Sequence, residues 1–238
     1  MPRLLIAALA LLALLHPAPA PAQGSGIAVP HFAAPAGFSE LSAETELFRR
    51  SAEEAVANGR LLHLYLPQDM ARLYAEGKAH AVTRQVLVCG IGSQEAPLDR
   101  NAVELMARSA EGMFIGFASI PHESGASAEQ AHAARSAALQ RSLEKGTPLL
   151  VDSLRTPSAY LHTCLVHFRM TDRPENVFLP MALATAVVPV KDSVLTLTAS
   201  SLLGQDDPEP HLAWVKKSAS DFADAIAQAG RTRKKTQP

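Results

Sequence analysis

The sequence predicts an α+β fold: a central, largely antiparallel sheet of about six strands flanked by helices, which is an αβα sandwich. Two observations lead to this prediction. Four strand-like segments follow one another between residues 149 and 200 with short connections, and such strands pair antiparallel. An amphipathic helix then ends the chain, and its continuous apolar stripe is suited to packing on a sheet.

Residues 1–22 have the features of a cleavable secretory signal peptide. Arg3 supplies the basic start, Leu4–Leu15 is apolar, and Ala20-Pro21-Ala22 matches the small-residue cleavage pattern, with Gln23 as the first mature residue. The apolar stretch is shorter than the ~20 residues that span a bilayer. We therefore expect a periplasmic or secreted protein without a membrane span after cleavage; the alternative is an uncleaved N-terminal anchor.

The mature chain is predicted to form one domain. Residues 23–37 are rich in Gly, Ala and Pro and are expected to be an extended lead-in, residues 38–230 a single α+β domain, and residues 231–238 a basic tail. The formal net charge of the chain is only −1, and a short basic tail is typical of a solvated end. The composition therefore predicts no nucleic-acid partner.

The first half of the domain is expected to alternate helices and strands. The predicted order is helix 42–57, strand 61–66, helix 68–76 and strand 82–89. Asn58-Gly59 and Gly77 are typical of helix ends. The alternation of Leu62, Leu64 and Leu66 places them on one side of the first strand.

Two helices are predicted in the middle of the chain. The first opens at Pro97 and Asp99 and stops before Pro121. The second begins with a capping box, Ser127-x-x-Gln130, and ends at Lys145-Gly146.

Strands and a helix form the last part of the chain. The strands are predicted at Leu149–Leu154, Ala159–Met170, Val177–Val190 and Ser193–Ser200. Lys191-Asp192 is expected to make the last two a hairpin, and Pro180 indicates a sheet edge or a strand start. The final helix is predicted to start at Pro208 and Pro210, with Gly230 just past its end.

Two segments carry a resemblance to a known group of proteins. Pro35-Ala36-Gly37-Phe38 is an early Pro-x-Gly-aromatic segment, and Ala186–Ala229 contains a strand, a tight turn, the strand Leu195-Thr196-Leu197-Thr198 and a terminal helix. In these segments the chain resembles the PsbP and DcrB-like proteins, exported αβα sandwiches that also include a Ran-binding import factor. The resemblance implies a binding or assembly accessory, and it supplies no catalytic residues to carry over.

The two cysteines, Cys89 and Cys164, form an even pair in a chain predicted to enter an oxidising compartment. This favours a disulfide between them. The alternative is two separate buried thiols that act as small apolar residues.

The strand Ala159–Met170 contains the candidate binding residues. A period of two places His162 on one face of the strand and His167 and Arg169 on the other, and these three are the predicted binding residues. His162 and Cys164 share a face and are suitable zinc or copper ligands. Two ligands do not make a site unless His63 and Cys89 converge on them, so we expect no metal and no cofactor.

No motif specifies a reaction. Ser142-x-x-Lys145 lacks the partner motifs of penicillin-recognising enzymes. A Ser-His-Asp triad that uses Asp152 and His162 depends entirely on the fold. We therefore assign no catalytic residue and expect an exported, non-catalytic protein that binds an envelope protein or a small ligand. The alternative is an exported hydrolase with a serine- or metal-based site.

Overall fold

A computed structural model of the chain describes residues 32–55, 59–79, 81–91, 114, 116–120, 125–169, 178–190 and 193–232. The predicted signal peptide, most of the lead-in, most of the helix expected from Asp99 and the last six residues lie outside the described residues.

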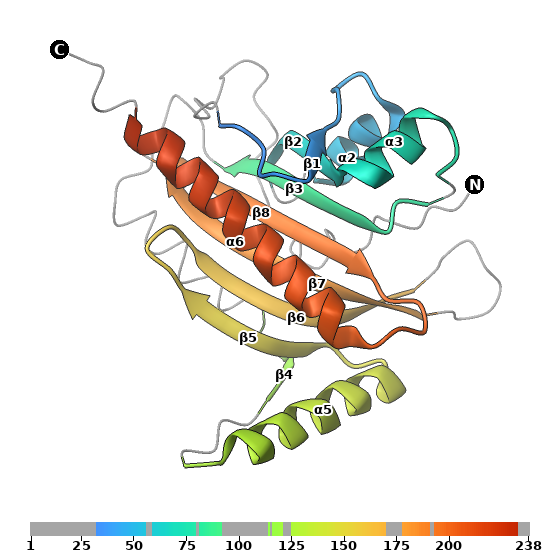
Figure 1. Ribbon diagram of the computed structural model, residues 1–238, viewed down its shortest axis with the longest axis vertical. Helices are drawn as coiled ribbons and strands as arrows, with labels where there is room; N and C mark the ends of the chain where they lie inside the picture. Colours follow the sequence, from blue (N-terminus) through green and yellow to red (C-terminus); the bar gives the residue numbers. More distant parts are fainter. Residues whose placement is uncertain are drawn as a thin grey trace.

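The described strands form one mixed, eight-stranded sheet in the order β1-β2-β3-β8-β7-β6-β5-β4 (Figure 1). Their bounds are β1 (Phe38–Glu40), β2 (Arg60–Pro67), β3 (Arg84–Ile91), β4 (Ala118–Ser119), β5 (Leu149–Arg155), β6 (Tyr160–Arg169), β7 (Phe178–Val190) and β8 (Ser193–Leu202). Every pair is antiparallel except β4 with β5. The predicted α+β class and largely antiparallel pairing are confirmed.

The estimate of six strands is two too low, because β1 and β4 were missed. They lie at the two edges of the sheet and have three and two residues, too few to show an alternating pattern. The helix predicted to stop before Pro121 is wrong for Ala118–Ser119, because these residues form β4.

Helices lie on both faces of this sheet. The described helices are α2 (Glu46–Ala55), α3 (Gln68–Ala75), α5 (Ala128–Lys145) and α6 (Pro208–Thr232). α6 lies along β6, β7 and β8 (Figure 1), and we call this side of the sheet the α6 face. α2 packs against β2 and β3 from the opposite side, the α2 face. In this part of the chain no helix has both the length and the apolar character that crossing a bilayer requires.

The ends of α5 follow the sequence closely. The Ser127 backbone N–H donates to Gln130 Oε1 at 2.8 Å, and Gln130 N–H donates to Ser127 Oγ at 3.2 Å, so the predicted capping box is present. Gly146 ends the helix with a φ of 62°. α6 begins at Pro208 as predicted, but it continues to Thr232, so Gly230 lies within the helix and not past its end.

The pairing of β2 differs from the predicted simple alternation. A bulge between Leu61 and His63 shifts the register of β2 against β3. Leu61 and Leu64 therefore pack together on the α2 face, whereas Leu62 packs against the core beneath α6. The prediction that Leu62 and Leu64 share a side was wrong, because a bulge reverses the alternation and leaves no clear mark in the sequence.

The last two strands pair as predicted. Val190 pairs with Ser193, so Lys191-Asp192 is the connection of a hairpin. β7 lies between β6 and β8 in the interior of the sheet. Pro180 therefore marks the start of a strand and not a sheet edge.

Candidate functional site

His162 of β6, the first predicted binding residue, is buried on the α2 face. Its side chain and backbone together are only 3% exposed. Nδ1 lies 2.9 Å from Oγ of Ser153 on β5, and the ring centroid lies 4.9 Å from that of Phe114. The residue is thus part of the interior beneath this face.

His162 belongs to a row of polar side chains that crosses four neighbouring strands. Thr198 of β8 pairs with Thr185 of β7, Thr185 pairs with His162, and His162 pairs with Ser153. Neighbouring strands lie about 4.8 Å apart, so the row is about 14 Å long. Thr185 and Thr198 are buried, whereas Ser153 at the end of the row is exposed.

Two more polar residues lie beside this row on the same face. Gln85 of β3 pairs with Ser200 of β8, and both are buried. Gln85 Oε1 has no hydrogen-bond partner. We call this set the polar patch: Gln85, Ser153, His162, Thr185, Thr198 and Ser200. Leaving a buried acceptor without a partner costs about 1–3 kcal/mol, so the patch holds hydrogen-bonding capacity that the described residues do not use.

Apolar clusters border the polar patch on two sides. Toward α2, the cluster contains Leu64, Leu87 and Cys89, packed against side chains of α2 such as Phe48. Toward β6 and β7, a second cluster groups Cys164, Val166, Met181 and Leu183 with Phe114 and Phe117. The α2 face therefore presents a polar centre between two apolar borders.

The other predicted binding residues do not join this patch. His167 points to the α6 face, as the period of two predicted, and neither of its ring nitrogens has a hydrogen-bond partner. Burial lowers the pKa of His167. The backbone of Arg169 ends β6, but its side chain lies outside the described residues. His162 and His167 therefore belong to opposite sides of the sheet and cannot form one site.

The predicted disulfide between Cys89 and Cys164 is wrong, and both thiols are free and buried. Cys89 lies on β3 and Cys164 on β6, with β8 and β7 between them. Three inter-strand steps separate the residues by at least about 14 Å, twice the Cα separation of about 7 Å that a disulfide tolerates. Burial raises the pKa of each thiol to about 12, so these are the separate buried thiols of the alternative interpretation.

The residues considered as metal ligands also stay apart. His63 lies on the α6 face, where Nδ1 is 2.6 Å from Glu40 Oε1 and the ring stacks on Tyr65. It does not approach His162 or Cys164 on the opposite face. Among the described residues, no group of three or more His, Cys, Asp or Glu side chains has an arrangement that could hold a metal ion.

A serine, a histidine and an aspartate meet at the start of α6. Ser201 Oγ lies 2.8 Å from His211 Nδ1, and His211 Nε2 lies 3.6 Å from an oxygen of Asp206. Arg84 Nε donates to the same serine hydroxyl at 3.2 Å. Ser201 is buried, and its hydroxyl is engaged by both Arg84 and His211. The group holds the first turns of α6 to the sheet.

Ser142 likewise has a structural role. It is buried near the end of α5, and its hydroxyl donates to the Thr147 backbone carbonyl at 2.6 Å. The hydroxyl thus satisfies one backbone carbonyl in the turn after the helix. Lys145 lies in the last helical turn, where the helix dipole favours a cation.

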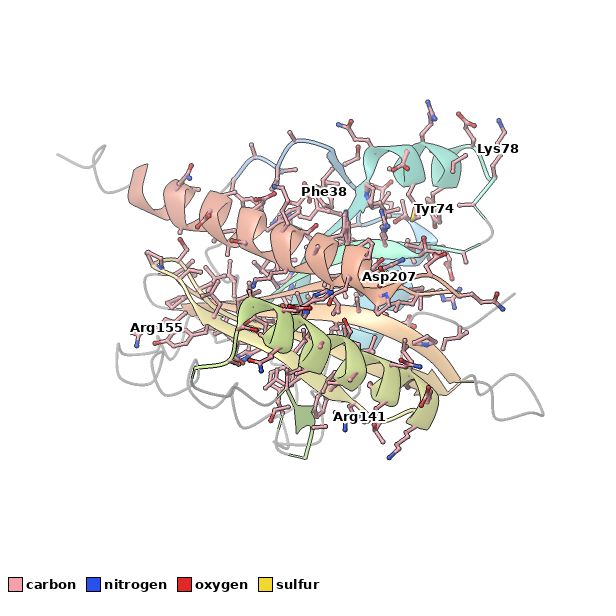
Figure 2. All side chains as sticks on the ribbon, turned by 60° about the horizontal axis from the view of Figure 1, so that its bottom comes forward. Phe38, Tyr74, Lys78, Arg141, Arg155 and Asp207 are labelled. Carbon is pink, nitrogen blue, oxygen red and sulfur yellow. The ribbon has the colours of Figure 1, made fainter. Side chains whose placement is uncertain are left out.

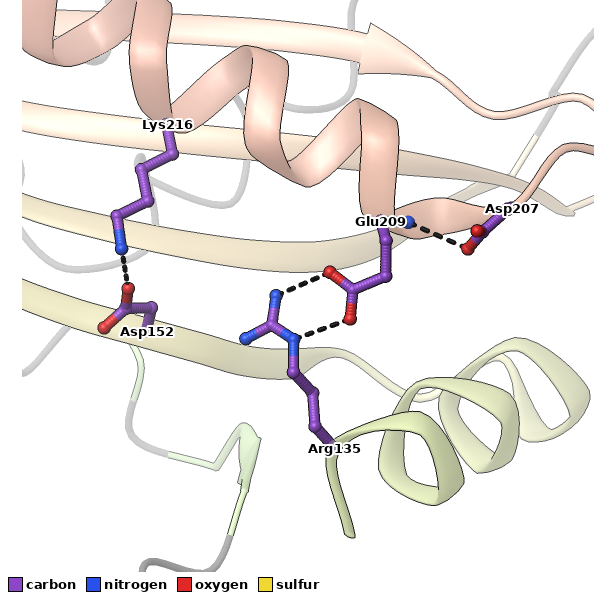
Figure 3. Close-up of polar contacts among 5 residues, drawn as sticks. All are labelled: Arg135, Asp152, Asp207, Glu209 and Lys216. Carbon is purple, nitrogen blue, oxygen red and sulfur yellow. Dashed lines mark hydrogen bonds and ion pairs between the residues drawn. The ribbon is translucent and has the colours of Figure 1, made fainter. Parts of the chain in front are cut away.

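A charged seam between α5, β5 and α6 was not anticipated from the sequence (Figure 3). Arg135 of α5 pairs with Glu209 of α6, and Lys216 of α6 pairs with Asp152 of β5. The four residues are scattered along the chain, so no local pattern could have indicated the seam. Since Asp152 lies on the α6 face, the triad of Asp152 with His162 is excluded.

The sequence did contain a signal for part of the polar patch. Thr196, Thr198 and Ser200 alternate with Leu195, Leu197 and Ala199 along β8. Such alternation normally indicates a solvent-facing side, but Thr198 and Ser200 are buried. β8 is therefore buried on both of its faces, although one of them carries polar side chains. Buried polar side chains of this kind are the feature that indicates a candidate binding site.

Comparison of the chain with protein families finds no matching family model, and comparison with curated proteins finds no match. The function of the chain is therefore argued from its own residues.

Proposed function

We propose that this chain is an exported, non-catalytic binding protein, periplasmic or secreted, whose small-molecule ligand contacts the polar patch. The observation that carries the proposal is Gln85 Oε1, which is buried beside Ser200 and the threonines without a hydrogen-bond partner. Polar groups inside proteins are normally hydrogen-bonded, because the unpaired group loses the bonds that it makes to water. A ligand that bonds this patch would remove that cost.

Export and a non-catalytic role are supported by the features of the sequence. Residues 1–22 match a signal peptide, and the resemblance to the PsbP and DcrB-like proteins implies a binding or assembly accessory. Helices on both faces of a largely antiparallel sheet agree with the sandwich that this resemblance implies. The serine groups at Ser201 and Ser142 are buried and engaged in structural bonds.

Native mass spectrometry tests the binding role directly. The protein is produced from the full-length precursor, purified without denaturant and compared with the double variant Thr185→Val/Ser200→Ala. We expect the wild type to carry a small molecule that denaturation releases and the variant to lack it. Thr163→Val is the matched control, because Thr163 is a buried threonine on the α6 face. If the wild type takes up no small molecule even from an extract of its own compartment, the proposal is wrong.

Cell fractionation with N-terminal sequencing tests export. The mature protein is expected outside the cytosol and is expected to begin at Gln23. Recovery of the native product from the cytosol with Met1 intact would contradict the proposed location.

One observation favours a hydrolase as the second candidate. Ser153 is exposed, and its Oγ lies 2.9 Å from Nδ1 of His162, so the two could act as nucleophile and general base. The test is turnover of p-nitrophenyl esters by the wild type and by Ser153→Ala, each with and without a chelator. If the wild type hydrolyses the ester and Ser153→Ala does not, the protein is a serine hydrolase and the binding proposal is wrong. If the chelator abolishes hydrolysis, the activity depends on a metal site. We expect no turnover in any arm.

A further inference from the structure

We infer that the outer edge of β5 pairs with β5 of a second copy of this chain, so that two sheets join across a twofold axis at Leu154. The inference goes beyond the proposed ligand and does not depend on it. It follows from the exposure of this edge, from the direction of its backbone groups and from the side chains that twofold pairing brings together.

The second half of β5 is exposed, although the strand beside it is buried. Ser153–Arg155 are all exposed, whereas Leu161 and His162, their neighbours on β6, are 2% and 3% exposed. Arg155 lies at the periphery of the molecule (Figure 2). Among the described strands, β4 covers the outer side of β5 only at Leu149–Leu150. The exposure of three consecutive residues therefore indicates that the rest of this edge is open to solvent.

The turn between β5 and β6 decides which backbone groups point to the open edge. The Thr156 N–H donates to the Ala159 carbonyl at 2.9 Å, so these residues form a hydrogen-bonded pair. Hydrogen-bonded and non-hydrogen-bonded pairs alternate along an antiparallel ladder, so Leu154 bonds to β6 whereas Ser153 and Arg155 do not. The backbone N–H and C=O groups of Ser153 and Arg155 thus point outward, where they can pair with another strand.

Twofold pairing with an axis at Leu154 uses all of these outward groups. Ser153 of each copy then lies opposite Arg155 of the other, and each such pair exchanges both of its backbone hydrogen bonds. Leu154 meets Leu154 of the second copy in a non-hydrogen-bonded pair, the arrangement that brings side chains closest. On the α2 face, the Arg155 guanidinium of one copy can donate to the Ser153 hydroxyl of the other.

Other twofold registers are less favourable. An axis at Arg155 would place two guanidinium groups directly opposite each other, and like charges in that position are destabilising. An axis at Ser153 would place Leu154 opposite Asp152, whose carboxylate pairs with Lys216. The axis at Leu154 alone among these three joins two apolar side chains.

Leu154 is the residue that favours a second copy as the partner. It lies on the α6 face and is 44% exposed; in the part of the chain that the structure describes, Leu73 at 40% is the other exposed large apolar side chain. Contact between two Leu154 side chains removes this apolar surface from water. The short strand is therefore complementary to itself in both its backbone and its central side chain.

Sedimentation velocity over a range of concentrations tests the dimer. Because the contact is short, we expect the mature wild type to be a monomer when dilute and a dimer at high micromolar concentration. Leu154→Arg is expected to lose the dimer at every concentration and to keep the Tm of the dilute wild type, since Leu154 is exposed in the single chain. Leu73→Arg is the matched control and is expected to dimerise as the wild type does.

Single-cysteine variants test the register. Ser153→Cys, Leu154→Cys and Arg155→Cys are each oxidised with copper phenanthroline and analysed by non-reducing electrophoresis. The Cα atoms of a non-hydrogen-bonded pair lie about 4.5 Å apart, which a disulfide tolerates. Only Leu154→Cys is expected to give a covalent dimer, and the native Cys89 and Cys164 are buried and do not interfere.

Three results would overturn the inference. One is a wild type that stays monomeric at every concentration, and another is a dimer that Leu154→Arg leaves intact. The third is a covalent dimer of Ser153→Cys or Arg155→Cys but not of Leu154→Cys. If the wild type is instead bound to a different protein from the envelope and Leu154→Arg loses that protein, the edge binds another chain and a second copy is not its partner.

Discussion

Arg135 holds the carboxylate of Glu209 with two hydrogen bonds, from Nε to Oε1 at 2.6 Å and from Nη2 to Oε2 at 2.9 Å (Figure 3). The pair joins the middle of α5 to the first turn of α6. α5 buries few side chains of its own, and these are Ala138, Leu139 and Ser142. A charged contact therefore adds to the limited apolar packing that positions α5.

Arg135→Met is expected to lower the free energy of unfolding by about 1 kcal/mol, because the two side chains are each one-third exposed and water screens their attraction. Urea unfolding measures the loss, and hydrogen exchange is expected to quicken in α5 before other elements. Arg141→Met is the control, since Arg141 lies exposed on the same helix (Figure 2). Equal losses in the two variants, or unchanged exchange in α5, would contradict this role.

Gly59→Ala is expected to destabilise the protein by at least about 2 kcal/mol, because the backbone conformation is strained for a side chain and there is no room for one. The φ of Gly59 is +111°, and a Cβ there would lie 2.5 Å from the Gly90 carbonyl oxygen on β3. Gly37→Ala is the matched control, since its φ is +89° but its surroundings are open. Chemical denaturation should show a clearly larger loss for Gly59→Ala; equal losses would mean that the close approach of Gly90 has no energetic effect.

Native protein is expected to resist a thiol reagent such as DTNB at mildly alkaline pH. Burial raises the pKa of Cys89 and of Cys164 to about 12, so the reactive thiolate is scarce and inaccessible. Denaturation is expected to expose both thiols, and reducing agent is expected to leave the electrophoretic mobility of the protein unchanged. Detection of a Cys89–Cys164 disulfide in the native protein would contradict the strand order of the sheet.

Stability is expected to fall as the pH drops below about 6.5, in part because of His167. Burial lowers its pKa in the folded state, whereas the unfolded chain binds the proton near the ordinary value of 6.5. Below that pH the unfolded state binds more protons, so the stability present above 6.5 is lost as the pH falls toward the folded pKa.

Urea midpoints measured from neutral to mildly acidic pH test this assignment. His167→Met is expected to flatten the decline, because neither ring nitrogen of His167 has a hydrogen bond to lose. His132→Gln changes an exposed histidine on α5 and is expected to leave the decline unchanged. An identical pH dependence in the wild type and His167→Met would assign the effect to another group.

The regular elements could be predicted because their signals are local. The capping box of Ser127 and Gln130 lies within four residues, and the apolar positions of α6 repeat within each turn. Likewise, alternation along β6 correctly separated His162 from His167. The edge strands β1 and β4 were missed, since they are too short to carry a period.

The sequence by itself determined the class of fold, the main strands and which side chains of one strand share a face. Only the tertiary structure decided which strands are neighbours, and thereby kept Cys89 from Cys164 and brought Thr198, Thr185 and His162 into one row. The tertiary structure also decided that the face of the sheet with this row is buried. The physical reason is that periodicity records the relation of a residue to its own backbone, whereas strand order and burial follow from how distant segments pack around a shared core.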